Sequence, residues 1–395
     1  MPHSVGAQGV DEAHGTAAAE ELLPQDILRD FEGVNACAPM VRYGKLPFRA
    51  LVSRYETHLV WTPMMLAAEF SRSALARDSD FTTSSTERGE FYLAETYAGS
   101  PVAEWDPSTE PRRGLHSMSN GCRGGGGGKR RRKVKGRLII QFAANDPVQL
   151  ADASELAKPW VDGIDLNCGC PQKWAFQEGI GCALLRKPDL VRDLVRTTKQ
   201  RIGWDFPVSV KIRVDDDPSR TNELVSNAIA GGADFITVHG RTRHQSSEGY
   251  PVNPEAIAFA SSCAKGAVPV IANGDVFAKE DGEELRKKTG VQGVMSARGL
   301  LANPALFAGY SQTPLQAVQE FVDLSISTGL IFPLFHRHVA YMLESRFANK
   351  KDRIGFNGLT SYGGVLDWLE ESQMIEFGDG SGLNGVQRGV EALRV

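Results

Sequence analysis

Short apolar runs rich in β-branched residues alternate along the chain with longer amphipathic stretches. Helix-start signals such as Asp146-Pro147 and Asn253-Pro254 open the amphipathic stretches. Strands that alternate with helices indicate parallel β-α-β units. The apolar runs with the length and composition of buried strands are Val34–Met40, Leu59–Met64, Leu138–Ala143, Gly163–Cys168, Val208–Val214, Phe235–His239, Val268–Asn273 and Val291–Ser296.

These runs predict an α/β fold of the (β/α)₈ or TIM-barrel class, whose usual size is about 250 residues. A doubly wound open sheet is the rival architecture. That fold normally places a GxGxxG motif directly after its first strand. Here the first predicted strand ends in Ala38-Pro39-Met40, so the barrel is favoured.

The same pattern divides the chain into three parts. Residues 1–28 are rich in Ala and Gly and predict a disordered tail, and residues 29–310 predict the barrel. After Asn303-Pro304 the pattern becomes helical, so residues 311–395 predict a small helical domain. Its last stretch, Phe377 to Gly385, is Gly-rich and predicts a loose C-terminus.

One segment, at about residues 82–136, interrupts the alternation of strands and helices. Five consecutive glycines, Gly124–Gly128, precede a basic run, Lys129–Arg137. We predict a flexible insertion between the second helix and the third strand. Three interpretations of the basic run stay open: a nuclear-localisation signal, a contact with RNA phosphates, or a solvated loop.

Composition narrows the class of protein. The net charge of −4 over 395 residues gives no whole-chain sign of a nucleic-acid partner, so any RNA binding must come from local patches. The six cysteines form no disulfide framework and predict reduced thiols inside the cell. Cys168 and Cys170 have no second ligand pair at zinc spacing, so we expect no metal site. No apolar run reaches 18 residues and the N-terminus lacks a targeting pattern, which predicts a cytoplasmic or nuclear protein without a membrane span.

Polar and cationic residues gather where the predicted strands end. In such barrels the carboxyl ends of the strands build the active site. Packing alone does not explain this convergence, because a buried Lys or Arg without a partner is costly. The residues are Pro39, Met40 and Val41; Gln141; Asn167 and Cys170; Lys211 and Arg213; His239, Arg241 and Arg243; Asn273, Gly274 and Asp275; and Ala297, Arg298 and Gly299.

Two short motifs at strands seven and eight point to a phosphate site. Asn273-Gly274-Asp275 and Ala297-Arg298-Gly299 lie where barrels commonly hold phosphate. Glycine lets the backbone approach an anion, and Arg298 adds a charge-assisted contact. A lone Asn-Gly-Asp is more often a turn, but the pair of motifs favours phosphate.

The stretch Asn167-Cys168-Gly169-Cys170-Pro171 is the sharpest chemical signal. Pro171 biases Cys170 toward extended geometry, which presents its thiol at the barrel mouth as a nucleophile or a proton donor. Cys168, next to the strand, fits a buried apolar thiol.

Taken in order, the motifs ending in Met40 and Pro171, the Lys211 and Arg213 strand, His239–Arg243, Asn273–Asp275 and Ala297–Gly299 resemble the tRNA-dihydrouridine synthases over about residues 33–345. The resemblance implies FMN reduced by NADPH, hydride transfer to a uracil base of tRNA, and Cys170 as the proton donor. An ordinary thiol, with a pKa of about 8.5, is mostly protonated at neutral pH, as a general acid must be.

The resemblance also implies the roles of the other residues. The implied substrate contacts are Asn167, Arg241 and Arg243. A fixed cation, Lys211, would stabilise the reduced flavin ring. The implied FMN contacts are Pro39, Met40, Val41, Gln141, Lys211, His239, Asn273, Gly274, Asp275, Ala297 and Arg298.

The stretch from Thr313 to His338 resembles the eukaryotic subfamily that modifies tRNA positions 20a and 20b. In that subfamily the helical C-terminal domain holds the tRNA, and we expect a monomer. Two alternatives stay open. One is an FMN barrel acting on a free pyrimidine, which would work without tRNA. The other is a non-catalytic tRNA-binding protein, which would tolerate the loss of Cys170.

Overall fold

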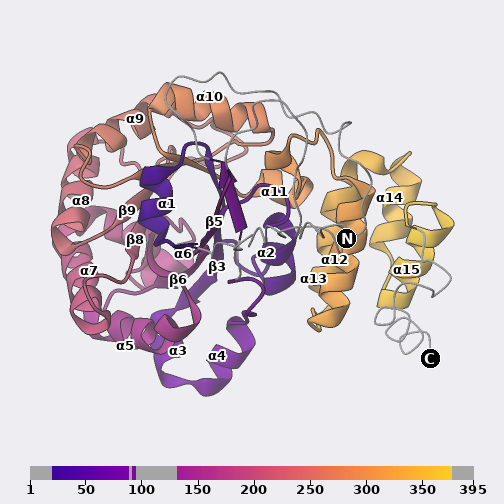
Figure 1. Cartoon of the computed structure of the whole chain (residues 1–395), viewed down its shortest axis with the longest axis horizontal. Coiled ribbons are helices and arrows are strands. Elements are labelled where there is room, and N and C mark those ends of the chain that lie inside the picture. The colour runs from indigo at the N-terminus through magenta and orange to yellow at the C-terminus, as the bar shows by residue number, and fades with distance from the viewer. Residues whose placement is uncertain (1–19, 89–90, 95–130, 376–395) are drawn as a thin grey trace, which may run out of the picture.

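The structure, a computed structural model, describes residues 20–88, 91–94 and 131–375. Eight parallel strands close into a barrel in the order β10-β11-β2-β3-β6-β7-β8-β9 (Figure 1). The predicted TIM barrel is confirmed. The barrel strands are β2 Val34–Cys37, β3 Leu59–Leu66, β6 Leu138–Ala143, β7 Gly163–Cys168, β8 Val208–Arg213, β9 Phe235–His239, β10 Val270–Asn273 and β11 Gly293–Ser296.

Helices surround the strands, and several begin at the residues that the sequence marks. Asp146 caps α5 by accepting from the backbone N–H groups of Val148 and Gln149, and Asn253 caps α9 in the same way. The barrel helices are α2 Leu46–Val52, α3 Ala67–Arg72, α4 Ala74–Asp80, α5 Pro147–Ala157, α6 Lys173–Gln177, α7 Pro188–Ile202, α8 Pro218–Gly231, α9 Pro254–Cys263, α10 Lys279–Thr289 and α11 Arg298–Ala302, with the 3₁₀ turns η2 Lys158–Trp160, η3 Gly181–Arg186 and η4 Leu306–Ala308.

The strands alternate between two surroundings, as the pleat requires. Outward side chains such as Ile140, Leu166 and Val210 pack against the helices. Inward side chains near the strand starts form an apolar amino-end layer: Val34, Leu59, Trp61, Ile139, Phe235 and Ile271. Inward side chains further along form a polar carboxyl-end layer: Gln141, Asp165, Asn167, Ser209, Lys211 and Asn273. The barrel interior is therefore a packed core at one end and a polar site at the other.

The amino end is closed by a segment that the sequence analysis assigned to a disordered tail. Helix α1, Pro24–Asp30, buries Ile27 and Leu28 against the amino-end layer, and β1, Glu20–Glu21, precedes it. The prediction for residues 20–28 is wrong, because this short helix covers apolar surface that would otherwise face water. Residues 1–19 lie outside the described residues.

The prediction of a structureless insertion is wrong at both ends of that segment. Strand β4, Phe91–Ala94, pairs antiparallel with β5, Arg131–Lys135, and β1 pairs with β5 to complete a three-stranded side sheet. Before β4, Glu87 forms a buried ion pair with Arg49 of α2. Partners so distant along the chain leave no local pattern. The glycine run, within residues 95–130, lies outside the described residues.

The described part of the basic run, residues 131–137, lies at the end of the barrel opposite the rim. Strand β5 leads into Leu138, the first residue of β6, so its backbone lies at the amino end. Within the run, Val134 is buried, and burial lowers the pKa of the Arg137 guanidinium to about 10. Two residues of the run are therefore part of the packed structure.

The described residues after the barrel form helices, as predicted. They are α12 Leu315–Ser327, α13 Phe332–Leu343, the 3₁₀ turn η5 Glu344–Arg346, α14 Lys350–Asn357 and α15 Tyr362–Glu371, at the right of Figure 1. His338 of α13 stacks on Phe48 of α2 at 4.7 Å between ring centroids, which joins this bundle to the barrel. The predicted loose stretch at residues 377–385 lies outside the described residues. No helix among the residues placed is long and apolar enough to cross a bilayer.

Candidate active site

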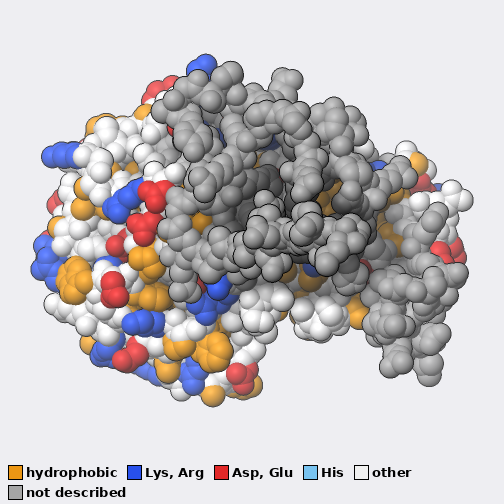
Figure 2. Space-filling model, in the orientation of Figure 1, with side chains coloured by type: hydrophobic (Ala, Val, Ile, Leu, Met, Phe, Trp, Pro, Cys, Tyr) orange, Lys and Arg blue, Asp and Glu red, His pale blue; other side chains and the backbone are white. Residues whose placement is uncertain are grey.

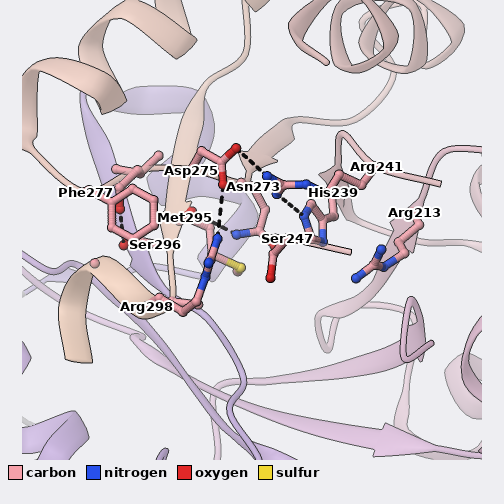
Figure 3. A pocket seen from close by; sticks show the side chains of 14 residues that line it. Arg213, His239, Arg241, Ser247, Asn273, Asp275, Phe277, Met295, Ser296 and Arg298 are labelled. Carbon is pink, nitrogen blue, oxygen red and sulfur yellow. Dashed lines mark hydrogen bonds and ion pairs between the residues drawn. The ribbon is translucent and has the colours of Figure 1, made fainter. Parts of the chain in front are cut away.

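A cavity of about 130 Å³ opens where β9, β10 and β11 end. His239, Arg241, Arg298 and Asp275 point toward one another in its wall (Figure 3). Within the described residues, no cluster of His, Cys, Asp and Glu could hold a metal ion. The full lining is Arg213, His239, Arg241, Ser247, Asn273, Gly274, Asp275, Val276, Phe277, Met295, Ser296, Ala297, Arg298 and Gly299.

Asp275 organises the cations of this cavity. Its Oδ2 accepts from Arg241 Nη2 and from the backbone N–H of Val252, and its Oδ1 accepts from Arg298 Nη2 at 3.1 Å. Burial opposes ionisation of Asp275, but these hydrogen bonds and the two arginines leave its pKa lowered. One carboxylate against two guanidinium groups leaves the cavity with a positive excess that suits an anion.

His239 is held neutral among these cations. Burial and then the charges of Lys211, Arg213, Arg241 and Arg298 lower its pKa to about 2. Its Nε2 lies 3.2 Å from Arg241 Nη1. A neutral imidazole at this point offers a hydrogen bond without adding repulsion.

Lys211 connects this cavity to the other half of the rim. Its Nζ donates to Asn273 Oδ1 at 2.9 Å, and Asn273 Nδ2 donates to the carbonyl oxygen of Met295. The side chain is only 8% exposed, and this burial lowers the pKa of its ammonium group to about 8, while Asp165 acts to raise it. The cation therefore lies fixed between β7 and β10.

A chain of buried hydrogen bonds crosses the carboxyl-end layer to the Cys170 loop. Ser209 Oγ and Gln141 Nε2 both donate to Asp165, each at 2.7 Å, and Asn167 Nδ2 donates to Gln141 Oε1 at 2.8 Å. Asn167 Oδ1 then accepts from the backbone N–H groups of Gly169 and Cys170. Burial raises the pKa of Asp165 to about 6.

Cys170 lies at the start of the loop between β7 and α6. It is half-buried beside Ala143, Met64, Ala175 and Ile180. Cys168, by contrast, is fully buried on the helix side of β7, and burial raises its pKa. Of the two cysteines in the motif, Cys170 is therefore the accessible thiol, as predicted.

Two arginines join the Cys170 loop to the loop after β9. Arg213 is buried and donates to the carbonyl oxygens of Gly169, Thr242 and Gln245. Arg243 lies over the ring of Phe176 on α6, with Cζ 4.5 Å from the centroid. These contacts hold the two loops together at the carboxyl-end opening of the barrel.

In each of the two motifs, the glycine lies where a side chain would not fit. Gly274 has φ of +133°, and a Cβ there would lie 2.6 Å from Val252 Cγ2. A Cβ on Gly299 would lie 2.1 Å from the carbonyl oxygen of Val276. Side chains are excluded by the protein itself at both positions.

The structure brings together most residues that the sequence singles out, but it divides them into groups. His239, Arg241, Asn273, Gly274, Asp275, Ala297 and Arg298 line the cavity. Lys211, Gln141 and Asn167 belong to the buried layer beside it. Pro39, Met40 and Val41 follow β2 on the rim, where Met40 is buried and Val41 exposed.

Two expected substrate contacts have other partners here. Arg241 is only 1% exposed and also donates to the carbonyl oxygen of Tyr250, so it belongs to the cavity wall. Asn167 shapes the Cys170 loop. Asp165 and Ser209 were not among the residues predicted from the sequence, where the one available signal was a carboxylate within the apolar strand Gly163–Cys168.

Comparison with known proteins gives consistent matches. The sequence model described as dihydrouridine synthase (Dus) matches residues 129–362. A mouse protein named tRNA-dihydrouridine(20a/20b) synthase [NAD(P)+]-like is 41% identical, with 88% of this chain and 91% of that protein covered. The human protein of the same name is 39% identical over 88% of this chain and 93% of its own length. The Schizosaccharomyces pombe tRNA-dihydrouridine(20a/20b) synthase [NAD(P)+] is 41% identical over 87% and 88%.

Proposed function

This chain belongs to the dihydrouridine synthase (Dus) family of oxidoreductases, and we propose that it reduces uridine to 5,6-dihydrouridine at positions 20a and 20b of tRNA, using FMN and NADPH. The observation that carries the proposal is one rim that unites the accessible Cys170, the buried Lys211 and an arginine-lined cavity. The positions 20a and 20b come from the names of relatives that cover nearly nine tenths of the chain.

The residues present fit FMN. The positive excess around Arg241, Asp275 and Arg298 suits its phosphate. Lys211 is a buried cation of the kind that stabilises a reduced flavin. Gln141 makes one hydrogen bond through each amide atom, so the second hydrogen on Nε2 and the second lone pair on Oε1 would be available to a bound flavin. When bound, FMN supplies the hydride that reaches uracil C6.

The chain's own residues do the remaining work. Cys170 donates the proton to uracil C5 from the mouth of the barrel. Asn167 and Arg213 hold the Gly169–Cys170 peptide that leads into that residue: Asn167 Oδ1 accepts from its N–H, and Arg213 donates to its carbonyl oxygen. His239, neutral because of its burial and neighbouring cations, completes the wall of the cavity without competing for the proton.

We propose that the helical bundle, α12 to α15, binds the tRNA. Arg337 on α13 is exposed and lies over the Tyr341 ring, with Cζ 5.2 Å from the centroid. Tyr43, from the loop after β2, meets Tyr341 edge-on at 5.7 Å. An exposed cation with aromatic rings beside a rim loop supports RNA contact at this junction.

The test is anaerobic spectroscopy of the purified chain after reconstitution with FMN. A flavin spectrum that bleaches with NADPH and returns on adding tRNA transcript lacking dihydrouridine is the expected result, with dihydrouridine at positions 20a and 20b in the product. Re-oxidation by free uridine at the same rate would favour a free-pyrimidine enzyme. A chain that takes up no FMN yet binds tRNA would favour the non-catalytic alternative.

A further inference from the structure

Helix α6 begins three residues after Cys170 and has an unusual exposure pattern for its five residues. Only Ala175 is buried, against Ala143 and Ile180 beside Cys170. Its two aromatic residues, Trp174 and Phe176, are each 44% exposed. Exposing two large apolar rings on one short turn does not stabilise the fold. Exposed apolar surface of this kind is typical of a binding site.

The two rings lie on different sides of the helix. Residues two apart on an α-helix are separated by about 200° around its axis. Phe176 faces the loop after β9, where Arg243 covers its ring. Trp174, two residues earlier, therefore points to a different side of α6, four residues after Cys170 in the chain.

The surroundings of α6 are cationic. Burial raises the pKa of the neighbouring Cys182 thiol to about 11, but Arg213, Lys211 and Arg243 act to lower it, which places three positive groups around this loop. The backbone N–H of Cys182 donates to the carbonyl oxygen of Cys170 at 3.0 Å, so Cys182 lies beside the Cys170 loop, and Arg213 donates to the carbonyl oxygen of Gly169 in that loop. Arg243 is itself half-buried and still meets solvent.

Exposed aromatic faces beside cations fit unpaired nucleotides. Bases stack on aromatic rings and on guanidinium planes, and the cations neutralise the phosphates between them. A target base must leave its stack to reach an enzyme's active site, which leaves its neighbours unstacked. These neighbours need new surfaces on which to stack.

We propose that Trp174 on one side of α6 and the Phe176–Arg243 pair on the other provide two separate stacking surfaces, together called the platform, for the unpaired nucleotides that flank the target uridine. The proposal rests on the proposed function and adds to it the residues that position the substrate next to Cys170. The platform acts on binding and on the placement of the base. It has no part in the reduction of the enzyme by NADPH.

The chain offers a matched control at the other end of the barrel. Trp160, in the turn η2 before β7, is 58% exposed, yet β7 starts at the amino end, away from Cys170. Because Trp160 is also exposed but lies at the opposite end of the barrel from Cys170, its substitution tests whether position, rather than exposure, decides the effect on tRNA turnover.

The experiment compares Trp174→Leu, Trp174→Phe, Phe176→Leu and Trp160→Leu in the full FMN-loaded chain. Leucine keeps an apolar side chain without a face for stacking, whereas phenylalanine keeps the face. Trp174→Leu and Phe176→Leu should each lower kcat/KM for tRNA transcript by about 5- to 150-fold, the range for one stacked base. Trp174→Phe should recover most of the loss, and Trp160→Leu should stay within about twofold of wild type.

Two further readouts separate the platform from a structural effect on the loop. The rate of flavin reduction by NADPH and the rate of alkylation of Cys170 by iodoacetamide should stay at wild-type values in every variant. Loss of tRNA turnover together with changes in these rates, or equal losses in Trp174→Leu and Trp174→Phe, would overturn the platform. So would wild-type turnover in both leucine variants. If the wild-type chain itself leaves tRNA unmodified, the proposed function fails instead.

Discussion

The two ends of the barrel interior come from the same eight strands but carry opposite chemistry. At the amino end, Leu59, Trp61 and Phe235 pack with Leu28 of α1 into a buried apolar cluster. At the carboxyl end, Asp165, Lys211 and Asn273 are buried in hydrogen bonds and have partners across several strands. A shift of two residues along each strand is enough to pass from a core to a site.

The amino end of the barrel therefore contributes mainly to stability, and the carboxyl end mainly to activity. The amino-end layer removes apolar area from water, which stabilises the fold without regard to what binds above it. The carboxyl-end layer holds charged groups away from water, which costs stability and fixes their geometry. On the face shown in Figure 2, acidic and basic side chains are interspersed over the coloured surface of the barrel at the left.

The largest effect is expected from Cys170→Ala. Turnover with tRNA should fall by about 100-fold or more, because a positioned general acid contributes about 10²- to 10⁴-fold. Alanine removes only the sulfur atom and keeps the backbone contacts of the loop, so FMN content and reduction by NADPH should persist. Dihydrouridine formed at a near wild-type rate by this variant would mean that another group donates the proton.

Leu28→Ala tests the opposite end. It should lower the free energy of unfolding by about 2–5 kcal/mol, as expected for a large-to-small change in a core, while kcat per folded molecule stays near wild type. Urea unfolding and tRNA turnover, measured on the same preparation, check this. A drop in kcat without a drop in stability would contradict the separation of the two ends.

Asp165→Asn tests the cost of the buried carboxylate. The pKa of Asp165 is raised from 3.8 to about 6, so between these values the folded chain holds a proton that the unfolded chain has lost. The free energy of unfolding of the wild type, relative to that of the variant, should therefore fall by about 2 kcal/mol as pH rises from about 4 to 6. Asparagine can keep bonds to both Gln141 and Ser209 and lacks this titration, so its stability curve should be flatter. Parallel urea-unfolding curves for the two proteins across this pH range would refute the assignment.

The smallest effect is expected from neutralising β5. Changing Arg131, Arg132 and Lys133 to Gln should alter kcat/KM for tRNA by less than about threefold, because the strand lies at the amino end, away from Cys170. Turnover at two salt concentrations measures this. A tenfold loss that disappears at high salt would extend the RNA-binding surface around the barrel and revive the phosphate interpretation of the basic run.

The sequence by itself determined the barrel strands to within a few residues, because each strand is a local run of apolar residues whose edges are marked by turn and helix-start signals. It also determined the rim, since the carboxyl ends of parallel strands must meet. Cys170 and Lys211 could be named for that reason.

Only the tertiary structure decided which partners these residues have. Asp165 binds Gln141 and Ser209 from neighbouring strands, and Asp275 pairs with Arg241 of the loop after β9 and with Arg298 of α11. Likewise β4 pairs with β5, which is distant in the sequence, and α1 packs against the amino-end layer. The physical reason is the same in each case: local patterns record whether a residue is buried, whereas the partner of a buried charge or of an edge strand depends on segments that only the closed barrel brings together.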